Sequence, residues 1–229
     1  ESPGFRGRLR GGLTAKTMPD CGPISITVLG SGTSVGVPTI GCSCAVCRSD
    51  DPRDKRLRPS IVIHLRDGAD ERNVLIDTTP DFRQQALRAG FKTLNAILYT
   101  HSHADHIMGL DDIRPFNYGR AERIPVHATP DTQQNLQRIF PYAFEGEAPH
   151  PGGKPRVEAR PIHNGPIELF GVSFLPVPLI HGPKKSTGFR FGRAAYLTDH
   201  SDIPASSVEL LRDLNVVQRL EIECGGVVV

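Results

Sequence analysis

The sequence predicts a mixed α/β protein built as one domain. Short apolar runs typical of buried strands alternate along the chain with stretches whose apolar residues recur at helical spacing. The 229 residues are 38% hydrophobic, enough for one domain that buries about 70–75% of its unfolded surface. No internal repeat and no long linker interrupts this pattern, so we predict no second domain.

The start of the sequence is predicted to lie outside the folded domain. Residues 1–17 are rich in Gly and Arg and carry no apolar periodicity, so we interpret them as a disordered N-terminal extension. The domain then comprises residues 18–229. The extension lacks the 7–15-residue apolar stretch of a secretory signal. No apolar run approaches the roughly 20 residues that span a bilayer, so we expect no membrane segment.

The elements of the domain follow from local patterns. Apolar or alternating runs predict the early strands, at 24–29, 61–65, 74–76 and 96–99. A helix is predicted at 81–89, ended by Gly90, and a second is expected to begin in the stretch 107–117. The stretch 130–139 predicts a helix, with Thr129 as N-cap and Pro130 at its first position. The remaining pattern predicts strands at 156–161, 167–170, 172–177, 188–191 and 194–198. A last helix is predicted at 205–214.

Four metal-ligand side chains occur within six residues directly after the apolar run 96–99. They are His101, His103, Asp105 and His106. An imidazole nitrogen binds a divalent ion such as zinc at about 2.0–2.1 Å, and a carboxylate can reach the same ion or a neighbour. Residues 101 and 103 alternate with period two and can point the same way, whereas 105 and 106 point elsewhere. The run predicts a centre for two adjacent metal ions; the alternative is a solvated loop that happens to be rich in His.

Three thiols occur together in a second short run, at Cys42, Cys44 and Cys47. This spacing suits one tetrahedral zinc ion better than a disulfide pattern. The alternative interpretation is a set of small buried hydrophobic side chains. Five cysteines, three of them clustered, indicate a reducing compartment, so we predict a cytoplasmic protein.

The run His-x-His-x-Asp-His after a hydrophobic strand resembles the signature of the metallo-β-lactamase-fold hydrolases. Two further positions of that family's pattern match His181, after the apolar run 178–180, and Asp199, after the run 195–198. The resemblance implies an αββα sandwich with two metal ions in its active site. One ion would be bound by His101, His103 and His181, the other by Asp105 and His106, with Asp199 bridging the two.

The same resemblance carries two further expectations. Asp77 follows the predicted strand 74–76 and matches an aspartate that supports the metal-binding loop without contacting an ion. The family's final metal-binding His follows a last helix, and no His follows His200 in this chain. We therefore expect the fold to be C-terminally incomplete in this sequence. His200 is a candidate substitute, although adjacent residues on a strand point to opposite faces.

The cysteine run follows a Gly-rich segment at 30–36, and the two together resemble the phosphodiesterase branch of this fold. Their pattern is similar to that of the cyclic phosphate phosphodiesterases of the carbon–phosphorus lyase pathway, where three cysteines hold a structural zinc ion. The resemblance implies a hydrolase that cleaves phosphodiesters, small cyclic phosphates above all. Hydroxide held by two divalent ions, zinc or manganese, would be the nucleophile, and Asp105 could accept the proton from water. Candidates for the fourth ligand of the cysteine site are Cys21 and Cys224.

Other functions stay open at this point. They are a transfer-RNA 3′ endonuclease, a lactonase or a thioesterase on the same fold, and a non-catalytic metal-binding fragment. The cysteine run disfavours a lactonase or thioesterase, and the chain shows no RNA-docking arm. A net charge of +2 gives no strong attraction to nucleic acid or membrane, and the basic stretch 53–58 has no aromatic residue for base stacking. We expect a small phosphodiester substrate, and analogy with the fold leaves a homodimer open.

Overall fold

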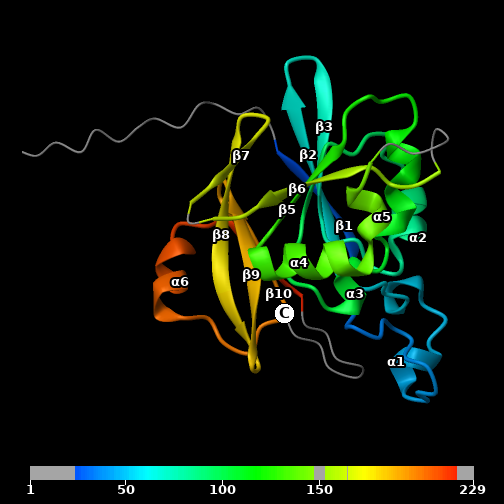
Figure 1. The fold of residues 1–229 in the computed structure, drawn as a ribbon. Helices are drawn as coiled ribbons and strands as arrows, with labels where there is room; N and C mark the ends of the chain where they lie inside the picture. The colour runs from blue at the N-terminus through cyan, green and yellow to red at the C-terminus, as the bar shows by residue number, and fades with distance from the viewer. Residues whose placement is uncertain (1–23, 147–152, 164, 221–229) are drawn as a thin grey trace, which may run out of the picture.

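The structure, a computed structural model, describes residues 24–146, 153–163 and 165–220 (Figure 1). The predicted extension 1–17 lies outside this range, as do Cys21 and Cys224. In the part of the chain that is described, no helix combines the length and the apolar character that crossing a membrane requires.

Two sheets form the centre of the molecule. The larger has six strands in the order β1-β2-β3-β4-β5-β6. Its strands are β1 (Ser25–Gly30), β2 (Ser60–Asp67), β3 (Asp70–Ile76), β4 (Ala96–Leu98), β5 (Ile124–Ala128) and β6 (Val157–Pro161). The second sheet has five strands in the order β11-β10-β9-β8-β7. Its strands are β7 (Ile167–Leu169), β8 (Val172–His181), β9 (Lys184–Phe191), β10 (Ala194–Thr198) and β11 (Val216–Leu220).

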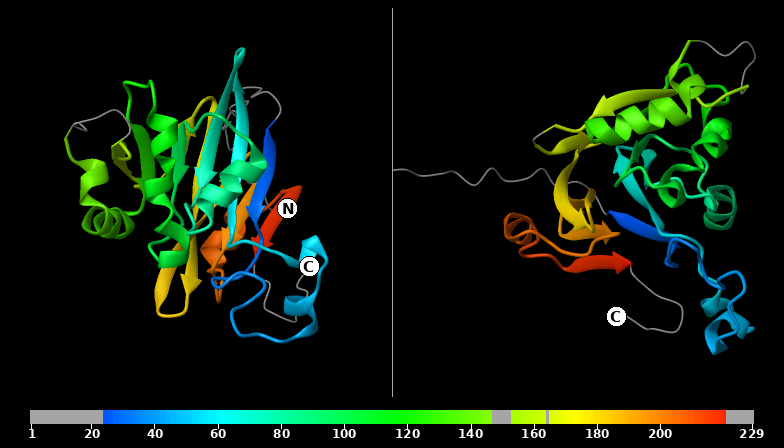
Figure 2. Two further views of the ribbon diagram at one scale, coloured as in Figure 1. Left: turned by 90° about the vertical axis from the view of Figure 1, so that its right-hand side faces the viewer. Right: turned by 60° about the horizontal axis from the view of Figure 1, so that its bottom comes forward.

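Helices cover the two outer faces of the sheets (Figures 1 and 2). The α-helices are α1 (Ala45–Arg48), α2 (Phe82–Ala89), α3 (Ala104–Ile107), α4 (Pro130–Ile139), α5 (Pro141–Phe144) and α6 (Ala205–Leu210). Two 3₁₀ helices are η1 (Pro52–Asp54) and η2 (Leu110–Asn117). Helix α6 packs on the five-stranded sheet, and α2 and α4 pack on the six-stranded sheet. The arrangement is an αββα sandwich and confirms the predicted fold class.

Alternation along the strands explains the layers. On β2, Ile61 and Ile63 face the second sheet and meet its aromatic side chains, whereas Val62 between them faces the helices. On the second sheet, Phe189 faces the first sheet. Leu197 and its neighbours instead form a smaller cluster under α6. Central strands such as β2 and β4 thus bury both faces, which explains why they appeared in the sequence as largely apolar runs.

Several predicted elements differ in detail from the structure. The predicted helix in 107–117 divides at Gly109, where a Cβ atom would lie 2.1 Å from the carbonyl oxygen of Thr79. Close approach of the backbone there separates α3 from η2, and Pro115 then lies inside the 3₁₀ helix. The predicted helix 205–214 ends at Leu210. Thr129 is the N-cap of α4 and Pro130 its first residue, as predicted, but the Thr129 hydroxyl donates to Thr132 Oγ1 and makes no capping bond.

Strand β11 was not predicted. It pairs in parallel with β10 and completes the five-stranded sheet. Its short run of residues gives little local signal, because a strand at the edge of a sheet owes its conformation to the neighbour that it pairs with.

Parallel pairing brings the ends of strands β3, β4 and β5 to one edge of the larger sheet. Asp77 directly follows β3, and the His-rich loop follows β4 after Tyr99 and Thr100. The backbone N–H of Thr187 on β9 donates to Thr100 O at 2.9 Å, which joins the second sheet to the same loop. Side chains from both sheets therefore meet at this edge.

His127, a half-buried residue on β5, predicts acid sensitivity of the fold. Burial, together with nearby Arg160 and against the attraction of Glu158, lowers the pKa of His127 to about 4. Its Nε2 atom is buried without a hydrogen bond to any described residue. His127 therefore binds a proton near pH 6.5 in the unfolded chain but only near pH 4 in the folded chain. Stability is retained above pH 6.5 and is lost as the pH falls from there toward 4.

We expect the melting temperature of His127→Gln to fall less between pH 7.5 and pH 5 than that of the unmodified chain. Thermal unfolding followed by circular dichroism at both pH values measures the difference. The exposed His163 lines a hollow of about 440 Å³ together with His127. It gives the control variant His163→Gln, whose melting temperature should depend on pH as that of the unmodified chain does. Identical acid sensitivity in all three proteins would contradict the assignment.

Candidate metal centre

Asp77 organises the loop that follows β4. It is fully buried, and its backbone φ of 64° turns the chain sharply away from β3. Its Oδ1 accepts from the Thr100 backbone N–H at 2.9 Å, and its Oδ2 accepts from the Thr100 hydroxyl at 2.8 Å. Oδ2 also lies 2.8 Å from His106 Nδ1. This arrangement supports the predicted role of Asp77, which holds the His-rich loop without belonging to either candidate ligand group.

The hydrogen bonds of Asp77 and Thr100 orient two imidazoles. His106 donates from Nδ1 to Asp77, and His101 Nδ1 lies 3.0 Å from Thr100 Oγ1, which can accept because its own proton goes to Asp77. Both rings then place Nδ1 against the support and direct Nε2 away from it, toward the other candidate ligand atoms. That is the arrangement that a histidine needs in order to bind a metal ion through Nε2.

Three histidine nitrogens converge on one point. His103 Nδ1 lies 3.0 Å from His101 Nε2 and 3.3 Å from His181 Nε2. In a tetrahedral site with bonds of about 2.0–2.1 Å, ligand atoms lie about 3.3–3.4 Å apart. The three side chains come from two segments: His101 and His103 lie in the loop after β4, and His181 ends β8 in the second sheet. The structure thus brings together the three histidines that the sequence assigned to the first ion.

Asp199 connects this group to a second one. Its Oδ2 lies 3.8 Å from both His101 Nε2 and His181 Nε2, and 3.3 Å from His106 Nε2. Its Oδ1 instead accepts from the Thr198 hydroxyl at 3.0 Å. Two groups of potential ligand atoms result, each within 4.8 Å, and Asp199 belongs to both. The first group is His101, His103, His181 and Asp199; the second is Asp105, His106 and Asp199.

The second group shows why these atoms suit a cation. Asp105 Oδ2 and His106 Nε2 are buried and lie 3.3 Å apart, but neither forms a hydrogen bond of acceptable geometry with any described residue. A buried polar atom left without a hydrogen bond costs about 1–3 kcal/mol. A metal ion among Asp105, His106 and Asp199 would provide the missing partner for both atoms, so the residues present fit a divalent cation.

The electrostatics of the cluster agree with this conclusion. Burial and the neighbouring histidines lower the pKa of His101 to about 3, so that ring is neutral and able to bind a metal ion at pH 7. Burial alone would lower the pKa of His106, but the carboxylates of Asp77, Asp105 and Asp199 raise it well above its usual value. Burial opposes ionisation of Asp199, yet His106 and His101 hold its pKa below its usual value. A positive charge is thus required beside Asp105 and Asp199, and either a proton or a metal ion can supply it.

The three cysteines form a separate candidate site. The Sγ atoms of Cys42, Cys44 and Cys47 lie within 4.8 Å of one another. Cys44 is the N-cap of α1, and its Sγ accepts from the Cys47 backbone N–H at 3.5 Å. Cys47 Sγ accepts in turn from the Thr39 backbone N–H at 3.3 Å. Backbone donors directed at sulfur stabilise thiolates, which are the form that binds zinc.

The Gly-rich segment supports the neighbouring loops through close packing. A Cβ atom on Gly30 would lie 2.0 Å from Arg58 O, and one on Gly32 would lie 2.6 Å from Arg56 O. The Gly32 backbone N–H donates to Leu57 O at 2.8 Å. Both glycines are therefore required where the segment passes the stretch between η1 and β2.

Two details of the site were not anticipated. His200 is buried beside Asp199 but belongs to neither ligand group, so the structure gives no support to its suggested role as a substitute ligand. Lys184 was overlooked, although its Nζ lies 3.2 Å from His103 Nε2. A Lys directly after the turn that follows His181 was the available signal.

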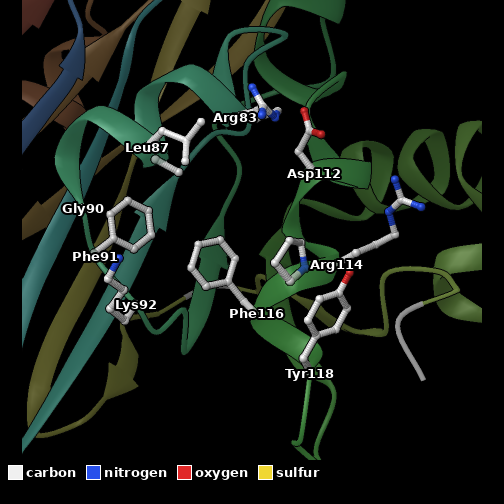
Figure 3. Close-up of a pocket in the computed structure, with 11 residues that line it drawn as sticks. Arg83, Leu87, Gly90, Phe91, Lys92, Asp112, Arg114, Phe116 and Tyr118 are labelled. Atoms are coloured by element: carbon white, nitrogen blue, oxygen red, sulfur yellow. The ribbon is translucent and has the colours of Figure 1, made fainter.

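A hollow of about 530 Å³ lies elsewhere, between α2 and η2 (Figure 3). Its wall contains Phe91 and Phe116, whose rings stack with centroids 5.4 Å apart, and Leu87 and Tyr118 flank it. None of the clustered His, Asp or Cys side chains lines this hollow. The candidate site is therefore defined by its converging ligand atoms.

Comparison with known proteins agrees with the geometry. A family model described as the beta-lactamase superfamily domain matches residues 72–218. A solved structure, described as a new diphosphatase from the PhnP family, is 52% identical to this chain. The similarity covers 85% of this chain and 73% of that one, with a TM-score of 0.75.

Curated relatives match over smaller parts of their length. An octanoyltransferase of Porphyromonas gingivalis (strain ATCC BAA-308 / W83) is 39% identical over 192 residues, which are 83% of this chain and 37% of that protein. Coenzyme PQQ synthesis protein B of Rhodopseudomonas palustris (strain TIE-1) is 34% identical over 104 residues, which are 40% of this chain and 32% of that protein. The chain thus spans about a third of the length of these two relatives.

The family match includes Asp77, the whole His-rich loop, His181 and Asp199. The αββα sandwich, the position of the ligand groups at the edge of its sheets and the similarity to the diphosphatase all agree with that match. The chain belongs to the beta-lactamase superfamily and, within it, to the PhnP family.

Proposed function

We propose that this chain is a metal-dependent hydrolase that cleaves phosphodiesters, with small cyclic phosphates as its first substrate class. One observation carries the proposal: two groups of metal-ligand atoms share a single carboxylate oxygen, Asp199 Oδ2. Paired metal sites with a shared ligand are typical of enzymes that hydrolyse phosphate esters. Membership of the PhnP family supports the same class of substrate.

In this proposal the side chains divide into two sets. His101, His103 and His181 would hold one divalent ion, zinc or manganese, and Asp105 and His106 would hold the other, with Asp199 between them. Two such ions supply Lewis acidity, which brings the pKa of water from 15.7 to about 7 and offsets the charge that grows on the phosphoryl oxygens.

The chain's own groups would position the reactants and move the proton. Asp105 belongs to the second ligand group, which shares Asp199 with the first, and its carboxylate could accept the proton of the attacking water. Asp77 and Thr100 hold the imidazoles of His101 and His106 in fixed orientations, so those rings need no rearrangement during turnover. A strained cyclic phosphate makes little demand on a general acid, because opening of the ring assists departure of the leaving oxygen.

A second substrate class is favoured by the similarity to the PhnP-family diphosphatase. In a diphosphate the leaving group is itself a phosphate, which departs readily without a proton donor. The same two groups of ligands would serve this reaction, and the difference would lie in the residues that bind the second phosphate.

The cysteine cluster is proposed as a structural zinc site. Cys42, Cys44 and Cys47 supply three ligands, and the structure groups no further described residue with them. A zinc ion there would fix the loop around α1, which has few other regular elements to stabilise it.

Metal content and hydrolysis measured on one sample test the proposed function. We expect about three metal ions per chain, two in the active site and one on the cysteines, together with hydrolysis of bis-p-nitrophenyl phosphate but not of a thioester. Treatment with a chelator should abolish hydrolysis, and zinc or manganese should restore it. Hydrolysis that survives complete metal removal would contradict the proposal, as would a metal-loaded protein inactive on cyclic phosphates, phosphodiesters and diphosphates.

A further inference from the structure

Lys184 is fixed beside the metal-ligand groups by the hairpin of β8 and β9. A two-residue turn, Gly182 and Pro183, joins the strands, and Gly182 has a φ of 56° that a side chain would disfavour. The register pairs His181 directly with Lys184. Residues directly opposite in an antiparallel pair point to the same face, so Lys184 lies on the face of His181. Lys185 pairs with Ile180 and points to the other face.

The ammonium group of Lys184 occupies an unexpected place. Its Nζ lies 3.2 Å from His103 Nε2, the ring nitrogen that faces away from the other histidines. Metal-binding histidines generally donate from their second nitrogen to an acceptor. His106 does so to Asp77, and His101 has a hydroxyl acceptor in Thr100. His103 instead meets a cation.

This contact is compatible only with a metal-free His103. The position of Nδ1, 3.0 Å from His101 Nε2, makes it the atom of His103 that would bind the ion. A neutral ring that binds through Nδ1 carries its proton on Nε2, so Nε2 can no longer accept from an ammonium group. Among the described residues, Lys184 has no other hydrogen bond or ion pair. With His103 bound to an ion, the ammonium group of Lys184 would lie beside the ligand group with no described residue to accept its hydrogen bond, and it could donate to an anionic group of the substrate instead.

We propose that Lys184 binds a second anionic group of the substrate, so that the site prefers phosphate esters or anhydrides with two negative charges to diesters with one. This inference rests on the proposed function and names the feature that selects among its substrates. An exposed ammonium on a flexible stem is suited to a terminal or adjacent phosphate, because three donors can follow its oxygens.

The test compares Lys184→Met with its matched control, Lys185→Met. Both variants remove one exposed charge from the same hairpin and keep the length of the side chain. Four quantities are measured on metal-loaded protein: metal ions per chain, the dissociation constant of inorganic diphosphate by calorimetry, kcat and KM. The substrates are bis-p-nitrophenyl phosphate, with one negative charge, and diadenosine diphosphate, with two.

We expect Lys184→Met to keep its metal ions and to bind diphosphate about tenfold more weakly, an effect in the range of a charged hydrogen bond. Its KM for diadenosine diphosphate should rise by a similar factor with kcat little changed, and its KM for the singly charged diester should stay within about twofold. Lys185→Met should match the unmodified protein in every measurement.

Equal binding of diphosphate by Lys184→Met and Lys185→Met would overturn the inference, and so would a failure of the unmodified protein to bind diphosphate. Loss of metal ions from Lys184→Met would also overturn it, because the Lys would then be a support for His103. If the unmodified, metal-loaded protein hydrolyses neither substrate and no cyclic phosphate, the proposed function fails. The binding measurement still decides whether Lys184 recognises a second anion.

Discussion

Replacing Asp199 by Ala is expected to abolish turnover. Its Oδ2 is the atom that the two ligand groups share, so its loss leaves each group one ligand short. The reduction in kcat should exceed the roughly 10–100-fold that follows loss of a residue supporting a metal ligand from outside. Steady-state hydrolysis of bis-p-nitrophenyl phosphate measures the effect, with metal content determined on the same sample.

Two further variants separate chemistry from folding. Asp199 has a φ of 48°, a conformation that Asn tolerates better than Ala, so Asp199→Asn removes the charge with less strain on the backbone. Asp202→Asn changes an exposed acid three residues away, whose carboxylate accepts from the Ile203 backbone N–H, and should keep full activity. Undiminished hydrolysis by a correctly folded Asp199 variant would refute the proposed bridging role.

The candidate centre could be predicted from the sequence because its ligands follow strands. Each of His101, His181 and Asp199 comes at or just after the end of an apolar run, and strands that end at one edge deliver such residues to one place. The structure brings together every predicted ligand of the two active-site groups. The roles of these ligands at the metal ions are predictions that metal binding tests. The cytoplasmic location and the homodimer are predictions as well.

What the sequence could not supply depends on pairing between distant segments. The position of Lys184 follows from the hairpin register that opposes it to His181, and a shift of one residue would exchange it with Lys185. The division between α3 and η2 likewise depends on contact of Gly109 with Thr79, thirty residues earlier. Such contacts leave no local pattern of apolar residues, so periodicity predicted a helix that begins in the stretch 107–117 but not its division at Gly109.

Replacing Asp77 by Asn is expected to lower the free energy of unfolding of the metal-free protein by about 3–5 kcal/mol, because it breaks a buried ion pair. Asp77 and His106 are both fully buried, with 2.8 Å between Oδ2 and Nδ1. The carboxylate accepts from two Thr100 donors as well. An amide offers only one oxygen for these donors and places an NH₂ group against the rest, so at least one buried donor loses its acceptor.

Asn is the informative replacement because it tolerates the φ of 64° at this position, whereas Ala would add backbone strain. Urea unfolding of chelator-treated protein measures the loss. Asp81→Asn is the control: its ion pair with Arg58, 2.9 Å long and partly exposed, should contribute about 0–1 kcal/mol.

The expected difference between these two acids follows from solvent. Asp81 is partly exposed, so water can hydrogen-bond to it and to Arg58 when their ion pair is lost. His106 and Thr100 are buried between the sheet and the loop, so no water can accept from their donors when Asp77 is replaced. Metal affinity of Asp77→Asn should also fall, by about 10–100-fold, since the imidazoles of His101 and His106 lose the support that directs their Nε2 atoms toward the ligand groups. Equal stability of the two variants would mean that Asp77 is dispensable and that packing alone orients the His-rich loop.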